Sequence, residues 1–145
     1  MNEPTLCIGA DVHLDDIVLR AVDKADGHEV IQRFHVTNNL PGAEAAAAAI
    51  SLTASQAGYS VLQFGWEATG MFWIPFHRYL SSCPQLRPFE LDFTCFNPQL
   101  VTKFKDGLVL RKPKNDERDA LDVALRLRFG ELPLSYLPTD FWQGL

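Results

Sequence analysis

Three segments near the start of the chain alternate between apolar and polar or small side chains, and this alternation restricts the possible folds more than any other feature of the sequence. The segments span residues 6–13, 16–23 and 29–36. A period of two is typical of β-strands that bury one face. The Ala-Asp-Gly sequence at 25–27 supplies the flexible residue for a tight reversal between the second and third segments. The sequence therefore predicts an antiparallel meander of three strands.

Helices and strands alternate in the remainder of the chain. An alanine-rich helix is predicted from residue 40, with Pro41 near its start and Gly58 just past its end. The further predicted elements are a strand at 61–66, a helix at 71–82, a strand at 89–96 and a helix at 116–129. A meander followed by such alternating units places the last two strands parallel to the first and beside it. We therefore expect an α/β protein of ribonuclease-H-like fold, with a five-stranded mixed sheet in the order 3-2-1-4-5 flanked by helices.

The composition is typical of one globular domain. The chain has 145 residues, of which 47% are hydrophobic and 21% charged, and this argues against a disordered or low-complexity protein. The uncharged stretch at 45–66 is interrupted by polar residues, so no membrane segment is expected. The start of the chain lacks the features of a secretory signal, and we expect a cytoplasmic protein. The predicted domain spans 1–131, and 132–145 is expected to be a linker or the truncated start of an absent carboxy-terminal domain.

The cysteines and histidines do not indicate a disulfide framework or a zinc site. Cys7, Cys83 and Cys95 are an odd number without C-x-x-C spacing, and we expect them to be reduced and buried. The four histidines show no H-E-x-x-H or similar spacing, and a structural role is favoured for each. For Trp66, Phe72 and Trp73, packing in the core is favoured over stacking on nucleic-acid bases.

The net charge of −5 conceals a gradient along the chain. Residues 1–100 hold five basic and eleven acidic side chains, whereas residues 101–130 hold eight basic and five acidic ones. Contact with a polyanion is therefore most expected in the second region, the alternative being a solvated loop and helix face. The candidate nucleic-acid-binding residues are Lys103, Lys105, Arg111, Lys112 and Lys114.

Two acidic residues end predicted strands, where a hydrophobic core would not place them. Asp11 lies at the end of the first strand on the same side as Gly9, and Glu67 follows the fourth strand on the same side as Gly65. Neighbouring parallel strands that both end in a carboxylate bring these charges side by side, at the edge where open α/β sheets bind ligands. The small residues beneath leave room at this edge.

Two further acids begin the last predicted helix. Asp116 and Asp119 extend its apolar stripe, whereas Asp122 falls elsewhere and is predicted to be solvated. The apolar stripe consists of Ala120, Val123 and Leu127. The alternative is that Asn115 or Asp116 caps the helix and Asp119 interacts favourably with the dipole of its first turn, together worth about 1 to 2 kcal/mol.

Four carboxylates that converge on one edge would repel one another unless a cation is bound. Oxygen ligands select hard cations such as Mg²⁺ or Mn²⁺, and two such ions about 4 Å apart can clamp both oxygens of a phosphodiester displacement. The predicted catalytic and metal-binding residues are Asp11, Glu67, Asp116 and Asp119. We therefore expect phosphoryl-transfer chemistry on nucleic acid, since no Walker-type glycine loop favours nucleotide hydrolysis.

Four short motifs resemble the successive motifs of the DEDD transposases, which are insertion-sequence recombinases that include the Piv DNA invertase. The motifs are D-V-H at 11–13, E-A-T-G at 67–70, N-P at 97–98 and K-N-D-E-R-D-A at 114–120. The resemblance covers most of the chain. It implies a RuvC-like amino-terminal domain whose four motif acids form a metal-binding tetrad and act on DNA strands during transposition.

The resemblance also implies partners. In that family a second, carboxy-terminal domain supplies a serine that attacks the phosphodiester, and some members are guided by a structured RNA encoded by the element. The expected partners are therefore DNA, a guide RNA as in those members, and further copies of the full-length chain in a homo-oligomer. Because this chain ends before such a domain, we do not expect it to carry out complete recombination in isolation.

Three alternatives remain open at this point. The domain is a RuvC-like nuclease, or a non-catalytic module that binds nucleic acid and retains the acids as remnants. The third alternative is half of an actin-like or sugar-kinase ATPase, which also opens with a strand that ends in aspartate. That fold needs glycine and hydroxyl residues after the aspartate, and residues 12–14 (Val-His-Leu) do not supply them.

Overall fold

The structure is a computed structural model, and it describes residues 3–68, 70–96 and 116–130, with the backbone alone at 116–118. The elements follow the predicted order. They are β1 (Thr5–Val12), β2 (Asp16–Asp23), β3 (Glu29–Thr37), α1 (Leu40–Ala57), β4 (Val61–Glu67), α2 (Ile74–Ser82), the 3₁₀ turn η1 (Pro84–Leu86), β5 (Glu90–Phe96) and α4 (Asp116–Phe129).

The five strands form one mixed sheet in the order β3-β2-β1-β4-β5. The pairs β1–β2 and β2–β3 are antiparallel, whereas β1–β4 and β4–β5 are parallel. This arrangement confirms the predicted meander, the predicted strand order and the central position of the first strand. Two parallel strands, β1 and β4, therefore lie side by side and end at the same edge.

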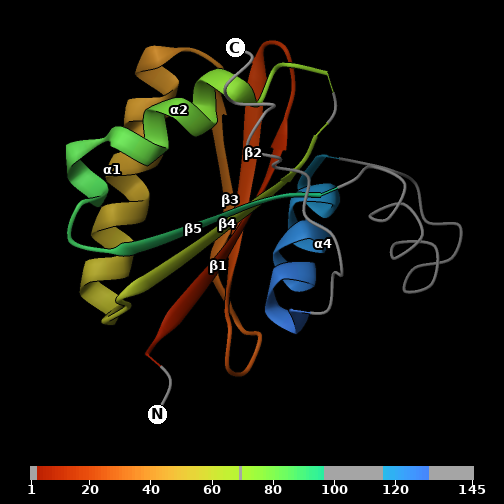
Figure 1. Cartoon of the computed structure of the whole chain (residues 1–145). Helices are drawn as coiled ribbons and strands as arrows, with labels where there is room; N and C mark the ends of the chain where they lie inside the picture. Colours follow the sequence, from red (N-terminus) through yellow and green to blue (C-terminus); the bar gives the residue numbers. More distant parts are fainter. Residues whose placement is uncertain (1–2, 69, 97–115, 131–145) are drawn as a thin grey trace, which may run out of the picture.

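Helices cover both faces of the sheet (Figure 1). The helices α1 and α2 pack on one face, and α4 packs on the other. The core under α1 is built from small residues of the helix against larger side chains of the strands, such as Ala46 and Ala47 beside Ile8 and Leu62. A smaller apolar cluster joins α4 to the sheet through Cys7, Val22, Phe96, Val123, Ala124 and Leu127. The two faces thus separate a general hydrophobic core from the face on which α4 lies.

The helix α1 has the ends that its sequence predicts. The side chain of Asn39 accepts a hydrogen bond from the backbone N–H of Gly42, which caps the first turn. Gly58 adopts a left-handed conformation with φ of 82° and ends the helix. A β-carbon at Gly42 would lie 1.7 Å from the carbonyl oxygen of Thr37, so α1 starts in direct contact with the end of β3.

The segment after β4 differs from the prediction in two respects. The helix begins at Ile74 rather than at residue 71, because Pro75 is tolerated only in the first turn of a helix. Trp66 and Trp73 are buried as predicted, but Phe72 is 41% exposed. Phe72 lies in the turn before the helix, where its backbone does not continue the buried face of α2.

Two further expectations can be compared with the described residues. All three cysteines are free and buried, as predicted. No helix within residues 3–68, 70–96 and 116–130 is long and apolar enough to cross a membrane.

Candidate active site

Asp11 and Glu67 lie at the ends of the two central parallel strands. In the β1–β4 pair Gly9 lies opposite Gly65 and Ala10 opposite Trp66, so the two acids occupy the next position of the same register. Because side chains alternate along a strand, Asp11 shares its face with Gly9, and Glu67 shares its face with Gly65. The structure thus places both acids at one edge and on one face of the sheet.

That face is the one that α4 covers. A β-carbon at Gly9 would lie 2.1 Å from the carbonyl oxygen of Ala120 and 2.5 Å from the backbone nitrogen of Ala124. A β-carbon at Gly65 would lie 3.0 Å from a methyl group of Leu127. The two glycines therefore allow α4 to lie directly against the backbone of the sheet, on the side of the strand-end acids.

The direction of α4 brings its first turn toward these acids. At its other end, Lys24 Nζ donates to the carbonyl oxygen of Leu127 at 3.1 Å, and Arg128 donates to the carbonyl oxygen of Ala25 at 3.2 Å. Lys24 and Ala25 lie at the edge of the sheet where β1 begins, so the helix runs antiparallel to β1. Its first residues, which include Asp119, therefore lie toward the edge where β1 and β4 end.

Asp119 faces inward as the helical spacing predicts, and its exposed fraction is 7%. The apolar stripe is buried with it, at Ala120, Val123 and Leu127. Asp116 is the first residue of α4, but its side chain lies outside the described residues. The backbone of Asp116 thus lies at the start of the predicted helix, and the direction of its carboxylate stays a prediction.

Asp122 corrects one expectation. Its side chain is 4% exposed, although its position on the helix predicts solvation. The reason is that α4 contacts β1, β2 and β4, so its buried arc is wider than the stripe of apolar residues. The apolar stripe in the sequence therefore predicts a smaller buried face of α4 than the sheet covers in the structure.

Asp11 has a side-chain partner that the sequence motifs did not identify. Its Oδ2 lies 2.9 Å from Nε2 of His13, and the two side chains are 16% and 42% exposed respectively. His13 follows the last residue of β1 and is two residues from Asp11, and this short spacing within the D-V-H motif is the signal in the sequence from which the contact could have been predicted. His13 thus orients the carboxylate of Asp11 while keeping part of its ring in solvent.

Comparison with known structures agrees with the fold of the chain. A solved structure of T. thermophilus RuvC in complex with a Holliday junction substrate matches with a TM-score of 0.55 at 11% sequence identity, and the match covers 90% of this chain and 98% of that one. The chain has the ribonuclease-H-like fold. No protein-family model matches the sequence, and no curated protein matches it.

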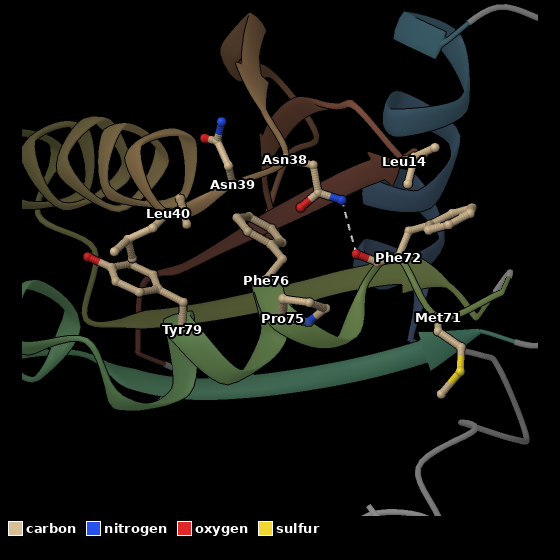
Figure 2. A pocket seen from close by; sticks show the side chains of 10 residues that line it. Leu14, Asn38, Asn39, Leu40, Met71, Phe72, Pro75, Phe76 and Tyr79 are labelled. Atoms are coloured by element: carbon tan, nitrogen blue, oxygen red, sulfur yellow. Dashed lines mark hydrogen bonds between the residues drawn. The ribbon is translucent and has the colours of Figure 1, made fainter.

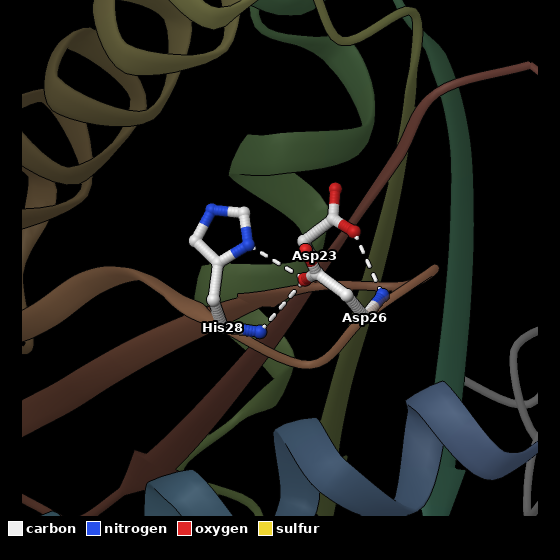
Figure 3. Close-up of side chains that lie close together, drawn as sticks. All are labelled: Asp23, Asp26 and His28. Carbon is white, nitrogen blue, oxygen red and sulfur yellow. Dashed lines mark hydrogen bonds and ion pairs between the residues drawn. The ribbon is translucent and has the colours of Figure 1, made fainter.

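The ribonuclease-H-like sheet also carries a group of potential metal ligands at the opposite edge (Figure 3). Among the described residues, Asp23, Asp26 and His28 form the one group of three whose ligand atoms all lie within 4.8 Å of one another, and it contains none of the predicted tetrad. Turn chemistry accounts for it, because Asp23 Oδ2 accepts from the backbone N–H groups of Ala25 and Asp26. Asp26 in turn accepts from the backbone and the ring of His28, and the backbone hydrogen bond is the main cause that lowers the pKa of Asp26.

The predicted tetrad has the donor chemistry that a hard divalent cation requires. Asp11, Glu67 and Asp119 offer carboxylate oxygens only, at an edge where the glycines of β1 and β4 admit the helix. Mg²⁺ or Mn²⁺ fits this set of donors better than a softer metal that selects sulfur or imidazole. The residues present therefore fit the predicted ion in their chemistry.

The predicted nucleic-acid-binding residues lie outside the described part of the chain. These are Lys103, Lys105, Arg111, Lys112 and Lys114. In the sequence they precede α4, which begins at Asp116. Their role stays a prediction.

Proposed function

We propose that this chain is the RuvC-like catalytic domain of a DNA transposase or recombinase of the DEDD type, with the domain spanning residues 1–131. The observation that carries the proposal is the placement of Asp11 and Glu67 in adjacent register at one strand edge, on the face against which α4 begins. The motifs around these acids and around Asp119 are those that resemble the DEDD family. Fold and motifs thus favour the same set of residues.

In this proposal Asp11, Glu67, Asp116 and Asp119 hold two divalent cations. When bound, such ions polarise the phosphodiester and neutralise the charge that develops on its oxygens. The residues of the chain position the reaction. The ring of His13 orients the carboxylate of Asp11. The packing of α4 on Gly9 sets the distance between Asp119 and the sheet.

DNA is the proposed substrate because the reacting group would be a phosphodiester and the segment before α4 is basic. Lysine and arginine side chains neutralise backbone phosphates without reading the sequence. The basic residues at 103–114 are proposed to hold the strand beside the acids, with a guide RNA as an additional partner and a homo-oligomer as the working state.

A nuclease that acts on branched DNA is the second candidate, since the solved RuvC structure holds a Holliday junction substrate. The two candidates share the site and differ in the kind of DNA on which they act. Four-way junctions, linear duplexes and insertion-sequence ends therefore distinguish them as substrates.

The test is hydrolysis of these DNA substrates by the full chain with Mg²⁺ or Mn²⁺, in which water attacks the phosphodiester in place of the serine that the resemblance assigns to a second domain. We expect metal-dependent nicking that the substitutions Asp11→Asn and Asp119→Asn each reduce by at least about 100-fold. Asp26→Asn is the matched control, because it removes the same charge at the opposite edge and should leave nicking unchanged. If wild-type protein and Asp11→Asn nick DNA equally, or if ATP rather than DNA is hydrolysed, the proposed function is wrong.

A further inference from the structure

One side-chain amide joins the two loops that leave the candidate active site. Asn38 lies between β3 and α1, and its Nδ2 donates to the carbonyl oxygen of His13 at 2.7 Å and to that of Phe72 at 3.0 Å. Figure 2 shows the second of these bonds, from Asn38 to the turn before α2. His13 follows Asp11 by two residues, and Phe72 follows Glu67 by five. The amide therefore connects the chain just beyond both strand-end acids.

The orientation of this amide follows from its partners. Both are carbonyl oxygens, which only accept hydrogen bonds, so the atom that faces them is the NH₂ group. Its two N–H groups are both used, one for each loop. The backbone N–H of Asn38 also donates to the carbonyl oxygen of Asp15 at 2.9 Å, which holds the residue against the β1–β2 turn. Asn38 is thus fixed by its backbone on one loop and reaches the other through its side chain.

The position of this connection matters because the pairing between β1 and β4 ends before the acids, although Asp11 still pairs with Val18 of β2 and Glu67 with Phe96 of β5. The register of β1 and β4 runs as far as Ala10 and Trp66, so Asp11 and Glu67 lie one position beyond it. Past that point the Asn38 amide forms a hydrogen-bonded connection between the segment after β1 and the segment after β4. On the β1 side, Asn38 binds the carbonyl oxygen of His13, and the ring of His13 lies 2.9 Å from the carboxylate of Asp11.

We propose that Asn38 is a positioning residue, whose amide sets the spacing of the Asp11 and Glu67 carboxylates by joining the loops that follow them. This inference rests on the proposed function, since it assigns that spacing to the binding of a divalent cation. Asn38 touches neither carboxylate, and it acts through the backbone of His13 and Phe72. No sequence motif singled it out, because its two partners are 25 and 34 residues away along the chain.

The groove beside Asn38 shows that this connection lies at the surface, where it can be altered without opening the main core (Figure 2). A cavity of about 380 Å³ is lined by Asn38 together with Leu14, Leu40, Met71, Phe72 and Phe76. Four of these apolar side chains are exposed, with fractions of 64% at Leu14, 60% at Leu40, 57% at Met71 and 41% at Phe72. Substitution of Asn38 therefore removes the connection between the loops and little buried apolar contact.

The experiment uses three variants of the full chain. Asn38→Asp keeps the size of the side chain but turns an oxygen toward both carbonyls, which breaks both hydrogen bonds. Asn38→Ala removes the bonds without adding a charge, and it keeps the test decisive if Asn38→Asp does not fold. Asn39→Asp is the matched control, because a carboxylate at that position still accepts the hydrogen bond from Gly42 that caps α1.

Two measurements are made on each variant: amide hydrogen exchange over residues 13–16 and 72–74, and calorimetric titration with Mn²⁺. We expect the Asn38 variants to exchange about tenfold faster in both loops and to bind Mn²⁺ about tenfold more weakly, with Asn39→Asp like the wild type. Unchanged exchange in either loop overturns the inference. So does unchanged Mn²⁺ affinity in the Asn38 variants when the wild type binds the ion.

These results separate the inference from the function on which it rests. If the wild type binds no Mn²⁺, the proposed function fails. Hydrogen exchange then decides alone whether Asn38 joins the two loops. If the wild type binds Mn²⁺ and the Asn38 variants bind it equally well, the function stands and the positioning role is wrong.

Discussion

Gly9 and Ala120 lie so close together that a β-carbon at Gly9 would be 2.1 Å from the carbonyl oxygen of Ala120. This contact sets how closely α4 approaches β1, and it thereby fixes Asp119 relative to Asp11. Neither residue has a functional group of its own. Their closeness nevertheless allows Asp119 of α4 to approach the ends of β1 and β4.

The first prediction concerns this contact. Gly9→Ala forces a methyl group into the backbone of α4, which cannot move aside as a flexible side chain can. We expect the free energy of unfolding to fall by about 3 kcal/mol, at the upper end of the range for overpacked cores. Urea denaturation followed by circular dichroism measures this decrease.

Gly58→Ala is the control for this variant. Gly58 has a φ of 82° and open space around its missing side chain, so only the left-handed backbone opposes alanine. That strain costs roughly 1 kcal/mol. A decrease for Gly9→Ala no larger than that for Gly58→Ala would mean that α4 does not lie against β1 as described.

The second prediction concerns His77 on α2, whose ring packs edge-on against Phe93 with centroids 4.6 Å apart. Burial of the ring, together with the nearby charge of Arg78, lowers the pKa of His77 from 6.5 to about 4. Between these two values the unfolded chain binds a proton that the folded protein does not, so stability falls as the pH drops from 6.5 to 4. The expected decrease over this window is about 1 to 3 kcal/mol.

The measurement is the urea midpoint of the wild type and of His77→Phe at several values between pH 7 and pH 4. Because phenylalanine does not titrate, the difference in stability between the two proteins should change steadily across the window. A difference between wild type and His77→Phe that is independent of pH would contradict the lowered pKa.

The third prediction concerns the basic segment before α4. If Lys103 and Lys105 neutralise phosphates of duplex DNA, replacing both with alanine should reduce the slope of log affinity against log salt by about 0.9 for each of these two side chains. Arg33→Ala, on the edge strand β3, should leave the slope unchanged. Fluorescence anisotropy of labelled DNA at several salt concentrations measures it, and an unaltered slope in the lysine variant would exclude this role.

The strands and their order could be predicted from the sequence because the physical rules involved are local. Alternation along residues 16–23 defines β2 with the bounds that the structure shows, and the sequence of element types leaves few ways to connect a five-stranded sheet. The inward direction of Asp119 was predictable for the same reason, since helical spacing relates it to Val123 and Leu127. Local periodicity thus accounts for the fold and for the face on which the site lies.

Contacts between distant segments could not be predicted in this way. The burial of Asp122 depends on how many strands α4 covers, and the exposure of Phe72 depends on where α2 begins. The connection made by Asn38 needs two loops that approach each other only after folding. For Asp116 and the basic residues before it, the sequence alone supports their assignment, because their side chains lie outside the described residues.

The most direct measurement is an anomalous scattering map from crystals of the full chain grown with Mn²⁺. The account predicts Mn²⁺ bound between the carboxylates of Asp11 and Glu67, with the side chains of Asp116 and Asp119 among its ligands. Mn²⁺ found only at Asp23, Asp26 and His28, or the side chains of Asp116 and Asp119 directed into solvent away from the strand ends, would contradict it.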